Sequence, residues 1–124
     1  MDREGARRYA EDWADAWNRR DLEAILDHFE DEVVFSSPRA LQVTGAPTVR
    51  GKASLREYWR AAIAQVGSLR FQVRRVLWDP AGAELSIVYD RELDGRHDRA
   101  SEVLQFGPSG RVARGEVFYG VVPS

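Results

Sequence analysis

The dipeptide Asp94-Gly95 is the strongest local constraint on how this chain can fold. It lies between two runs in which apolar and polar residues alternate, from 84 to 93 and from 96 to 106. An Asp-Gly pair favours the two-residue turn in which both residues have positive φ, and this turn fixes how the flanking strands pair. We therefore predict an antiparallel hairpin. Its predicted facing pairs are Leu93 with Arg96, Arg91 with Asp98, Tyr89 with Ala100 and Ile87 with Glu102.

This register places Glu102 on the more apolar face of the hairpin, between Ala100 and Leu104. We expect helices to cover that face, because burial of apolar surface is favourable. A carboxylate among apolar neighbours costs free energy unless it is paired or protonated, so we also expect a raised pKa. Glu102 is either an acid in a functional pocket or a structural carboxylate that accepts a hydrogen bond from a Tyr or Trp.

The same face carries the cross-strand pair Arg91–Asp98, close to the turn. Opposite charges that face each other across two strands are common and contribute little when exposed. The pair is therefore either an ordinary surface ion pair or, together with Tyr89, a group that orients a polar part of a substrate or a water molecule.

Two more strands are predicted on either side of the hairpin, over 69–78 and 111–121. Segments rich in Gly and Pro separate them from it and are typical of turns. In the first of these strands the apolar alternation shifts by one residue between Val73 and Val76. This shift predicts a β-bulge near Arg74-Arg75.

The first half of the chain is predicted to be mainly helical. Apolar residues three and four apart predict helices over 4–19 and 52–66, and Asp21 is a good N-cap for a shorter helix between them. Residues 33–37 are β-branched or aromatic and predict a strand that ends before a proline. Three helices and one strand therefore precede the four-stranded meander.

Residues 38–51 contain two Pro and two Gly, so we expect a long ordered loop with a short strand near 48–50. Loops of this length are often lids over a binding site. Helices followed by antiparallel strands predict an α+β domain, in which the helices cover one face of a curved sheet. The length of 124 residues is that of one domain, 1–124.

Composition excludes several classes of function. The formal charge of −2 is unlike that of a protein that neutralises nucleic-acid phosphates, so no nucleic-acid partner is expected. The chain has no cysteine and only two histidines, which leaves no thiolate or multi-histidine metal site. No cofactor is predicted. The sequence has neither a membrane-length apolar run nor an apolar leader, so we expect a cytoplasmic protein without a membrane partner.

Several segments resemble the nuclear transport factor 2-like superfamily, which includes ketosteroid isomerases, limonene epoxide hydrolases and SnoaL-type polyketide cyclases. The resembling segments are 17–22 with Phe29, then 33–38, 50–59 and 110–120. The resemblance implies a cone-shaped domain, in which a curved antiparallel sheet and three helices leave a deep pocket between them. It also commonly implies a dimer.

The similarity to ketosteroid isomerases carries over only in part. Their oxyanion-hole tyrosine falls on Trp13, their catalytic aspartate on Ser37, and their second oxyanion-hole acid on Glu102. Only Glu102 keeps its chemistry, so steroid isomerisation is not expected. The epoxide hydrolases use an Asp–Arg–Asp arrangement with a Tyr and an Asn that position water, and Arg91, Asp98 and Tyr89 are similar to it in residue type.

Two main hypotheses follow. The first is a SnoaL-like enzyme that binds a small apolar or aromatic molecule and performs acid/base chemistry of isomerase, cyclase or hydrolase type without a cofactor. Its expected catalytic residues are Glu102, Arg91, Asp98 and Tyr89. The alternative is a non-catalytic binding or dimerisation module, and a protein-interaction adaptor has less support. The residues expected to wall the pocket are Tyr9, Trp13, Ser37, Trp59, Ile87, Leu104 and Tyr119.

The last predicted strand suggests a homodimer. Along this strand Val112, Arg114, Glu116 and Phe118 alternate with Ala113, Gly115, Val117 and Tyr119. Neither face is therefore typical of a solvent-facing surface. A second copy packed on the outer face of the sheet would cover the mixed residues.

Overall fold

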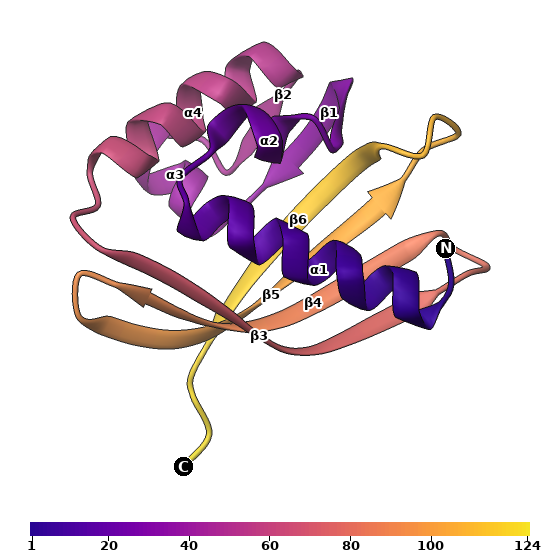
Figure 1. The fold of residues 1–124 in the computed structure, drawn as a ribbon. Coiled ribbons are helices and arrows are strands. Elements are labelled where there is room, and N and C mark those ends of the chain that lie inside the picture. Colours follow the sequence, from indigo (N-terminus) through magenta and orange to yellow (C-terminus); the bar gives the residue numbers. More distant parts are fainter.

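Four helices pack against the concave side of a curved, six-stranded sheet in the computed structural model, which describes residues 1–124 (Figure 1). The strand order across the sheet is β2-β1-β6-β5-β4-β3. None of the helices is long and apolar enough to cross a membrane. The elements in chain order are α1 (Arg3–Asn18), α2 (Leu22–Leu26), β1 (Phe29–Ser36), α3 (Pro38–Thr44), β2 (Thr48–Arg50), α4 (Lys52–Ala64), β3 (Leu69–Asp79), β4 (Glu84–Leu93), β5 (Arg96–Phe106) and β6 (Val112–Gly120).

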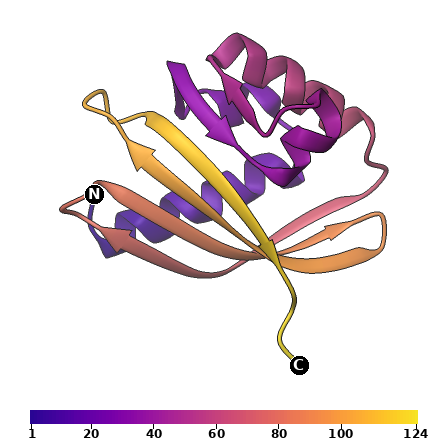
Figure 2. The same ribbon diagram turned by 180° about the vertical axis from the view of Figure 1, so that it is seen from behind.

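Helix α1 lies across the long strands, as Figure 2 shows from the other side of the sheet. The Asp2 side chain begins the helix by accepting a hydrogen bond from the Gly5 backbone N–H. At the other end, the Asn18 side chain exchanges two hydrogen bonds with the backbone of Phe71, at 3.0 and 2.7 Å. These bonds fix the end of α1 against β3. The buried stripe of α1 contains Ala6, Ala10, Trp13, Ala14, Ala16 and Trp17.

The predicted hairpin is confirmed. Asp94 and Gly95 have φ values of 52° and 84°, as a two-residue hairpin turn requires. All four facing pairs follow the predicted register, including Ile87 opposite Glu102. The bulge in β3 is also confirmed, because the pairing with β4 shifts between Val73 and Arg75.

The segment after the first strand differs from the expected loop. Residues 38–44 form α3, so four helices pack on the sheet, not three. Ser37 is the N-cap of α3 and accepts a hydrogen bond from the Ala40 N–H, Pro38 opens the first turn, and Gly45 ends the helix with φ of 86°. A capped start and a glycine stop were thus present in the sequence. The short strand at 48–50 is confirmed as β2.

The sheet is mixed and not wholly antiparallel. β1 pairs in parallel with β6, and it starts at Phe29, earlier than predicted. The two strands are joined through α3, α4 and the whole meander, so no turn between them could reveal the pairing. Phe35 lies beside Gly115, where an added Cβ would be 2.7 Å from the Phe35 ring. The glycine therefore leaves room for a buried aromatic side chain.

Gly115→Ala should lower the free energy of unfolding by about 1–3 kcal/mol, because the new methyl group overpacks the site. Phe35→Leu removes the ring that the methyl would meet, so adding Gly115→Ala to Phe35→Leu should cost less than adding it to the wild type. Urea unfolding of the four proteins measures this coupling. Equal costs in both backgrounds would contradict the close contact.

Candidate functional site

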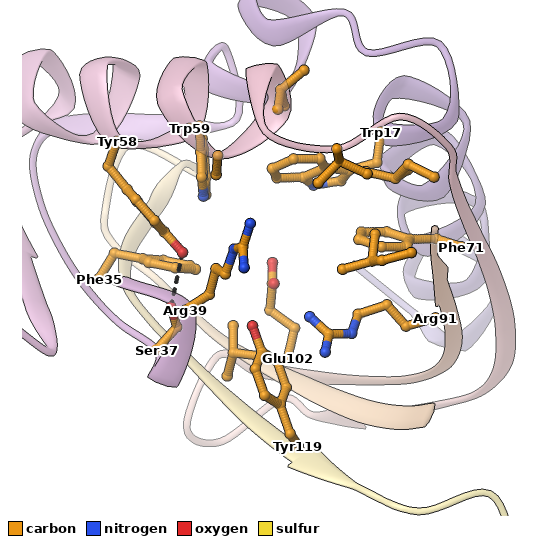
Figure 3. A pocket seen from close by; sticks show the side chains of 16 residues that line it. Trp17, Phe35, Ser37, Arg39, Tyr58, Trp59, Phe71, Arg91, Glu102 and Tyr119 are labelled. Carbon is orange, nitrogen blue, oxygen red and sulfur yellow. Dashed lines mark hydrogen bonds between the residues drawn. The ribbon is translucent and has the colours of Figure 1, made fainter. Parts of the chain in front are cut away.

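A pocket opens between the helices and the concave face of the sheet (Figure 3). Its cavity volume is about 70 Å³, and most of its lining residues are hydrophobic. An apolar lining with a few convergent polar groups is typical of a small-molecule site. The aromatic walls come from helices and strands that are far apart in sequence, and they are Trp17, Phe35, Tyr58, Trp59, Phe71 and Tyr119.

Glu102 lies at the floor of this pocket, and its carboxyl group points into the pocket (Figure 3). Its strand neighbours across the sheet are Ile87 and Val117, and only 4% of the residue is exposed. Burial raises its pKa to about 8, although a hydrogen bond from Trp13 Nε1 to Oε2, 3.0 Å long, favours the carboxylate. Glu102 is therefore mainly a neutral acid at pH 7.

Arg91 stands on one wall, to the side of the Glu102 carboxyl group (Figure 3). It donates two hydrogen bonds to Asp98, from Nε at 2.9 Å and from Nη2 at 2.8 Å. Its guanidinium carbon also lies 3.8 Å from the centre of the Tyr119 ring. Desolvation opposes its positive charge, but the bonds to Asp98 prevail and raise the pKa of Arg91 above its usual value. A permanent cation therefore faces the pocket.

The pocket widens outward into a polar mouth, which shares Arg39, Arg91 and Tyr119 with the apolar interior. The hairpin tip forms one side of the mouth, because Asp94 accepts hydrogen bonds from the backbone N–H groups of Gly67 and Ser68. The polar residues that line the mouth are Arg39, Gln42, Gln65, Arg91, Asp94, Arg96, Asp98 and Tyr119.

Five of the residues expected from the sequence line the apolar pocket: Ser37, Trp59, Arg91, Glu102 and Tyr119. Ser37 is held there by a hydrogen bond of 3.0 Å between its hydroxyl and that of Tyr58. The structure thus gathers residues from the N-cap of α3 and from α4, β4, β5 and β6 around one space.

The other expected residues lie outside the pocket lining. Asp98 is at the mouth, while Trp13 and Tyr89 are buried behind the wall, with ring centres 4.8 Å apart. Ile87 and Leu104 are fully buried in the core. These side chains do not line the pocket because α1 packs directly on this part of the sheet. Tyr9 is in α1, and its ring packs edge-on against His28 and Phe106, outside the pocket lining.

Sequence reasoning missed Arg39 and Tyr58 as pocket residues. Arg39 is in α3, which was expected to be a loop, and the Ser37–Gly45 capping pattern could have placed it on a helix. Tyr58 and Trp17 belong to the apolar periodicities that predict the helices over 52–66 and 4–19, and periodicity alone does not distinguish a pocket residue from a core residue. In the whole chain, no group of three or more His, Cys, Asp or Glu side chains is arranged to hold a metal ion.

A curved sheet that wraps around helices and leaves a pocket between the two layers defines a protein of the nuclear transport factor 2-like class. Residues 10–115 match the family model of the SnoaL-like domain, so this chain belongs to the SnoaL-like family. The predicted superfamily is thereby confirmed. No curated protein matches the chain.

Solved structures agree with this assignment. A SnoaL-like protein of unknown function from Burkholderia thailandensis is 33% identical and superposes with a TM-score of 0.85, covering 97% of this chain and 98% of that one. A nuclear transport factor 2-like protein of unknown function from Cytophaga hutchinsonii is 14% identical, with a TM-score of 0.70 over 93% and 89% of the two chains. A similar protein of unknown function from Burkholderia xenovorans is 19% identical, with a TM-score of 0.76 over 98% and 88%.

The pKa of Glu102 predicts how stability depends on pH. The folded protein keeps this proton up to about pH 8, whereas the unfolded chain loses it near the usual glutamate value. The stabilisation is therefore complete at low pH and is lost as pH rises through the folded pKa. Glu102→Gln removes this loss, so the variant should be more stable than wild type at pH 8, by on the order of a few kcal/mol.

Urea unfolding between pH 5 and 9 tests this prediction, with Asp90→Asn as a matched control. Asp90 is equally buried but on the outer face, where hydrogen bonds from Arg99 and Arg74 lower its pKa. The stabilisation that comes from the lowered pKa of Asp90 is present at neutral pH and is lost as pH falls. Asp90→Asn should therefore be less stable than wild type at neutral pH. If Glu102→Gln and wild type lose stability in parallel from pH 5 to 8, the buried neutral acid is refuted.

Proposed function

We propose that this SnoaL-like protein binds a small apolar or aromatic molecule in the pocket and moves a proton to or from it through Glu102, without a cofactor. The observation that carries the proposal is one buried carboxylic acid at the floor of an aromatic-walled pocket. The reaction type would be that of an isomerase, a cyclase or a hydrolase.

The chemistry follows from the two protonation states of Glu102. As a neutral acid it can donate a hydrogen bond to a carbonyl or enolate oxygen of the bound molecule. As a carboxylate it can remove a proton from carbon or from water, and a pKa near neutrality lets one group serve both roles. Trp13 holds Oε2 in place from behind, while Oε1 makes no hydrogen bond to the protein.

A non-catalytic binding module is the second candidate. It is favoured by Ser37, which stands where the resembling isomerases have their catalytic base and is itself bonded to Tyr58 and to the Ala40 N–H. In this case Glu102 serves only as a hydrogen-bond donor to the ligand, and the pocket selects molecules by shape and polarity.

The Kemp elimination of 5-nitrobenzisoxazole separates the two candidates. A base removes the ring C–H proton, the N–O bond breaks, and a cyanophenolate forms with no other reactant. The planar apolar substrate suits the aromatic walls. We expect kcat/KM to rise with pH and level off above about 8, in step with ionisation of Glu102. Glu102→Gln should lose this activity.

The control is Asp90→Asn, which changes a carboxylate on the opposite face of the sheet and should leave the elimination unchanged. Binding of the substrate is followed separately by quenching of Trp17 and Trp59 fluorescence. If the substrate binds but no turnover that requires Glu102 is observed, the non-catalytic binding module becomes the proposed function.

We also propose a homodimer that forms through the outer face of the sheet. This face combines the ion pairs of Asp90 with Arg74 and Arg99 with the exposed side chain of Phe118, which is 52% accessible. A second copy would bury the apolar surface and provide a polar rim. Sedimentation equilibrium should give a dimer at micromolar concentration for wild type and a monomer for Phe118→Asp. A wild-type monomer would contradict the proposal.

A further inference from the structure

The charges in the mouth of the pocket are not balanced. The mouth contains three arginines and two aspartates. Both aspartates already have partners within the protein: Asp98 accepts two hydrogen bonds from Arg91, and Asp94 accepts two from backbone N–H groups. The excess positive charge of the mouth therefore belongs to the other two arginines, Arg39 and Arg96.

Arg39 is the unneutralised arginine that also reaches the apolar interior of the pocket. Its side chain makes only two long hydrogen bonds, 3.4 Å each, to the neutral side-chain oxygens of Gln42 and Gln65. No carboxylate lies within ion-pair distance of it. Figure 3 shows its guanidinium pointing into the pocket, across from Arg91 and above Glu102. The Arg39 guanidinium is therefore a half-buried cation without a charged partner in the protein, and its N–H groups are available to an anionic ligand.

Arg91 has donors left for the same space. Its bonds to Asp98 use Nε and Nη2, and Tyr119 is its remaining hydrogen-bond partner in the protein, so not all of its five N–H groups are used. The Tyr119 ring under the guanidinium restricts its movement. Two guanidinium groups with unused N–H donors thus line the place where the apolar interior meets the mouth. Guanidinium groups form their strongest hydrogen bonds with carboxylates, often two at a time.

We infer that the ligand of this pocket is an organic anion: an aromatic or similarly apolar body that carries one carboxylate. The carboxylate lies between Arg39 and Arg91, and the apolar body extends inward along Trp59 and Phe71 toward Glu102. The inference rests on the proposed function, because the ligand occupies the same pocket. It adds the chemical class of the ligand and its direction in the pocket, with the reactive end inward.

The neutral form of Glu102 favours this arrangement. A carboxylate at the floor would repel the entering anion, whereas a carboxylic acid accepts it without this cost. The apolar walls also exclude water from the ion pair and so strengthen it relative to an exposed pair.

A matched pair of probes tests the inference by isothermal titration calorimetry at pH 7. The probes are 2-naphthoate and 2-naphthamide, which share size and shape and differ in charge. We expect wild type to bind 2-naphthoate about tenfold more tightly than the amide, with a preference that shrinks as salt is added. Arg39→Gln should remove this preference, while its affinity for the amide should stay at the wild-type value.

Arg8→Gln is the control for a change in net charge, since its exposed side chain lies on α1 away from the pocket. This variant should keep the full preference for 2-naphthoate. Equal affinity of wild type for the two probes, or an unchanged preference in Arg39→Gln, would overturn the anion site and leave the pocket proposal intact. If neither probe binds wild type, the small-molecule pocket fails, and the anion site fails with it.

Discussion

The hydrogen bond from Trp13 to Glu102 connects the two layers on which the pocket depends. It crosses from α1 to the concave face of β5 at a depth where neither group is exposed to water. A buried acid with no donor would be costly, and a buried indole N–H with no acceptor would be costly as well. Each group satisfies the other, which holds the acid in one orientation with its second oxygen toward the pocket.

The space in front of Glu102 exists because the layers separate toward one end. α1 packs closely on the core around Ile87 and Leu104, and its end is fixed to β3 by Asn18. Beyond that point α4 and α3 form the opposite wall. Asp94 then joins the hairpin tip to the segment that follows α4, because its side chain accepts hydrogen bonds from the backbone N–H groups of Gly67 and Ser68.

The two buried carboxylates of the sheet show how surroundings determine protonation. Asp90 and Glu102 are equally inaccessible and are on opposite faces. Asp90 has Arg74 and Arg99 beside it, which lower its pKa and keep it charged. Glu102 has one neutral donor and apolar walls, so burial dominates and its pKa rises. The same sheet therefore carries a structural ion-pair cluster outside and a titratable acid inside.

The sequence by itself determined the hairpin, its register, the bulge in β3, and hence the inward position of Glu102. These features depend on local turn chemistry and on a period of two, which a single segment carries. It also contained the capping pattern of α3, although its Pro and Gly residues favoured a loop. Only the tertiary structure decided the parallel pairing of β1 with β6, the burial of Ile87 and Leu104 in the core, the packing of Tyr9 outside the pocket, and the place of Arg39 opposite Arg91. Those outcomes depend on contacts between segments many residues apart, and no local pattern specifies which side chains meet across an empty space.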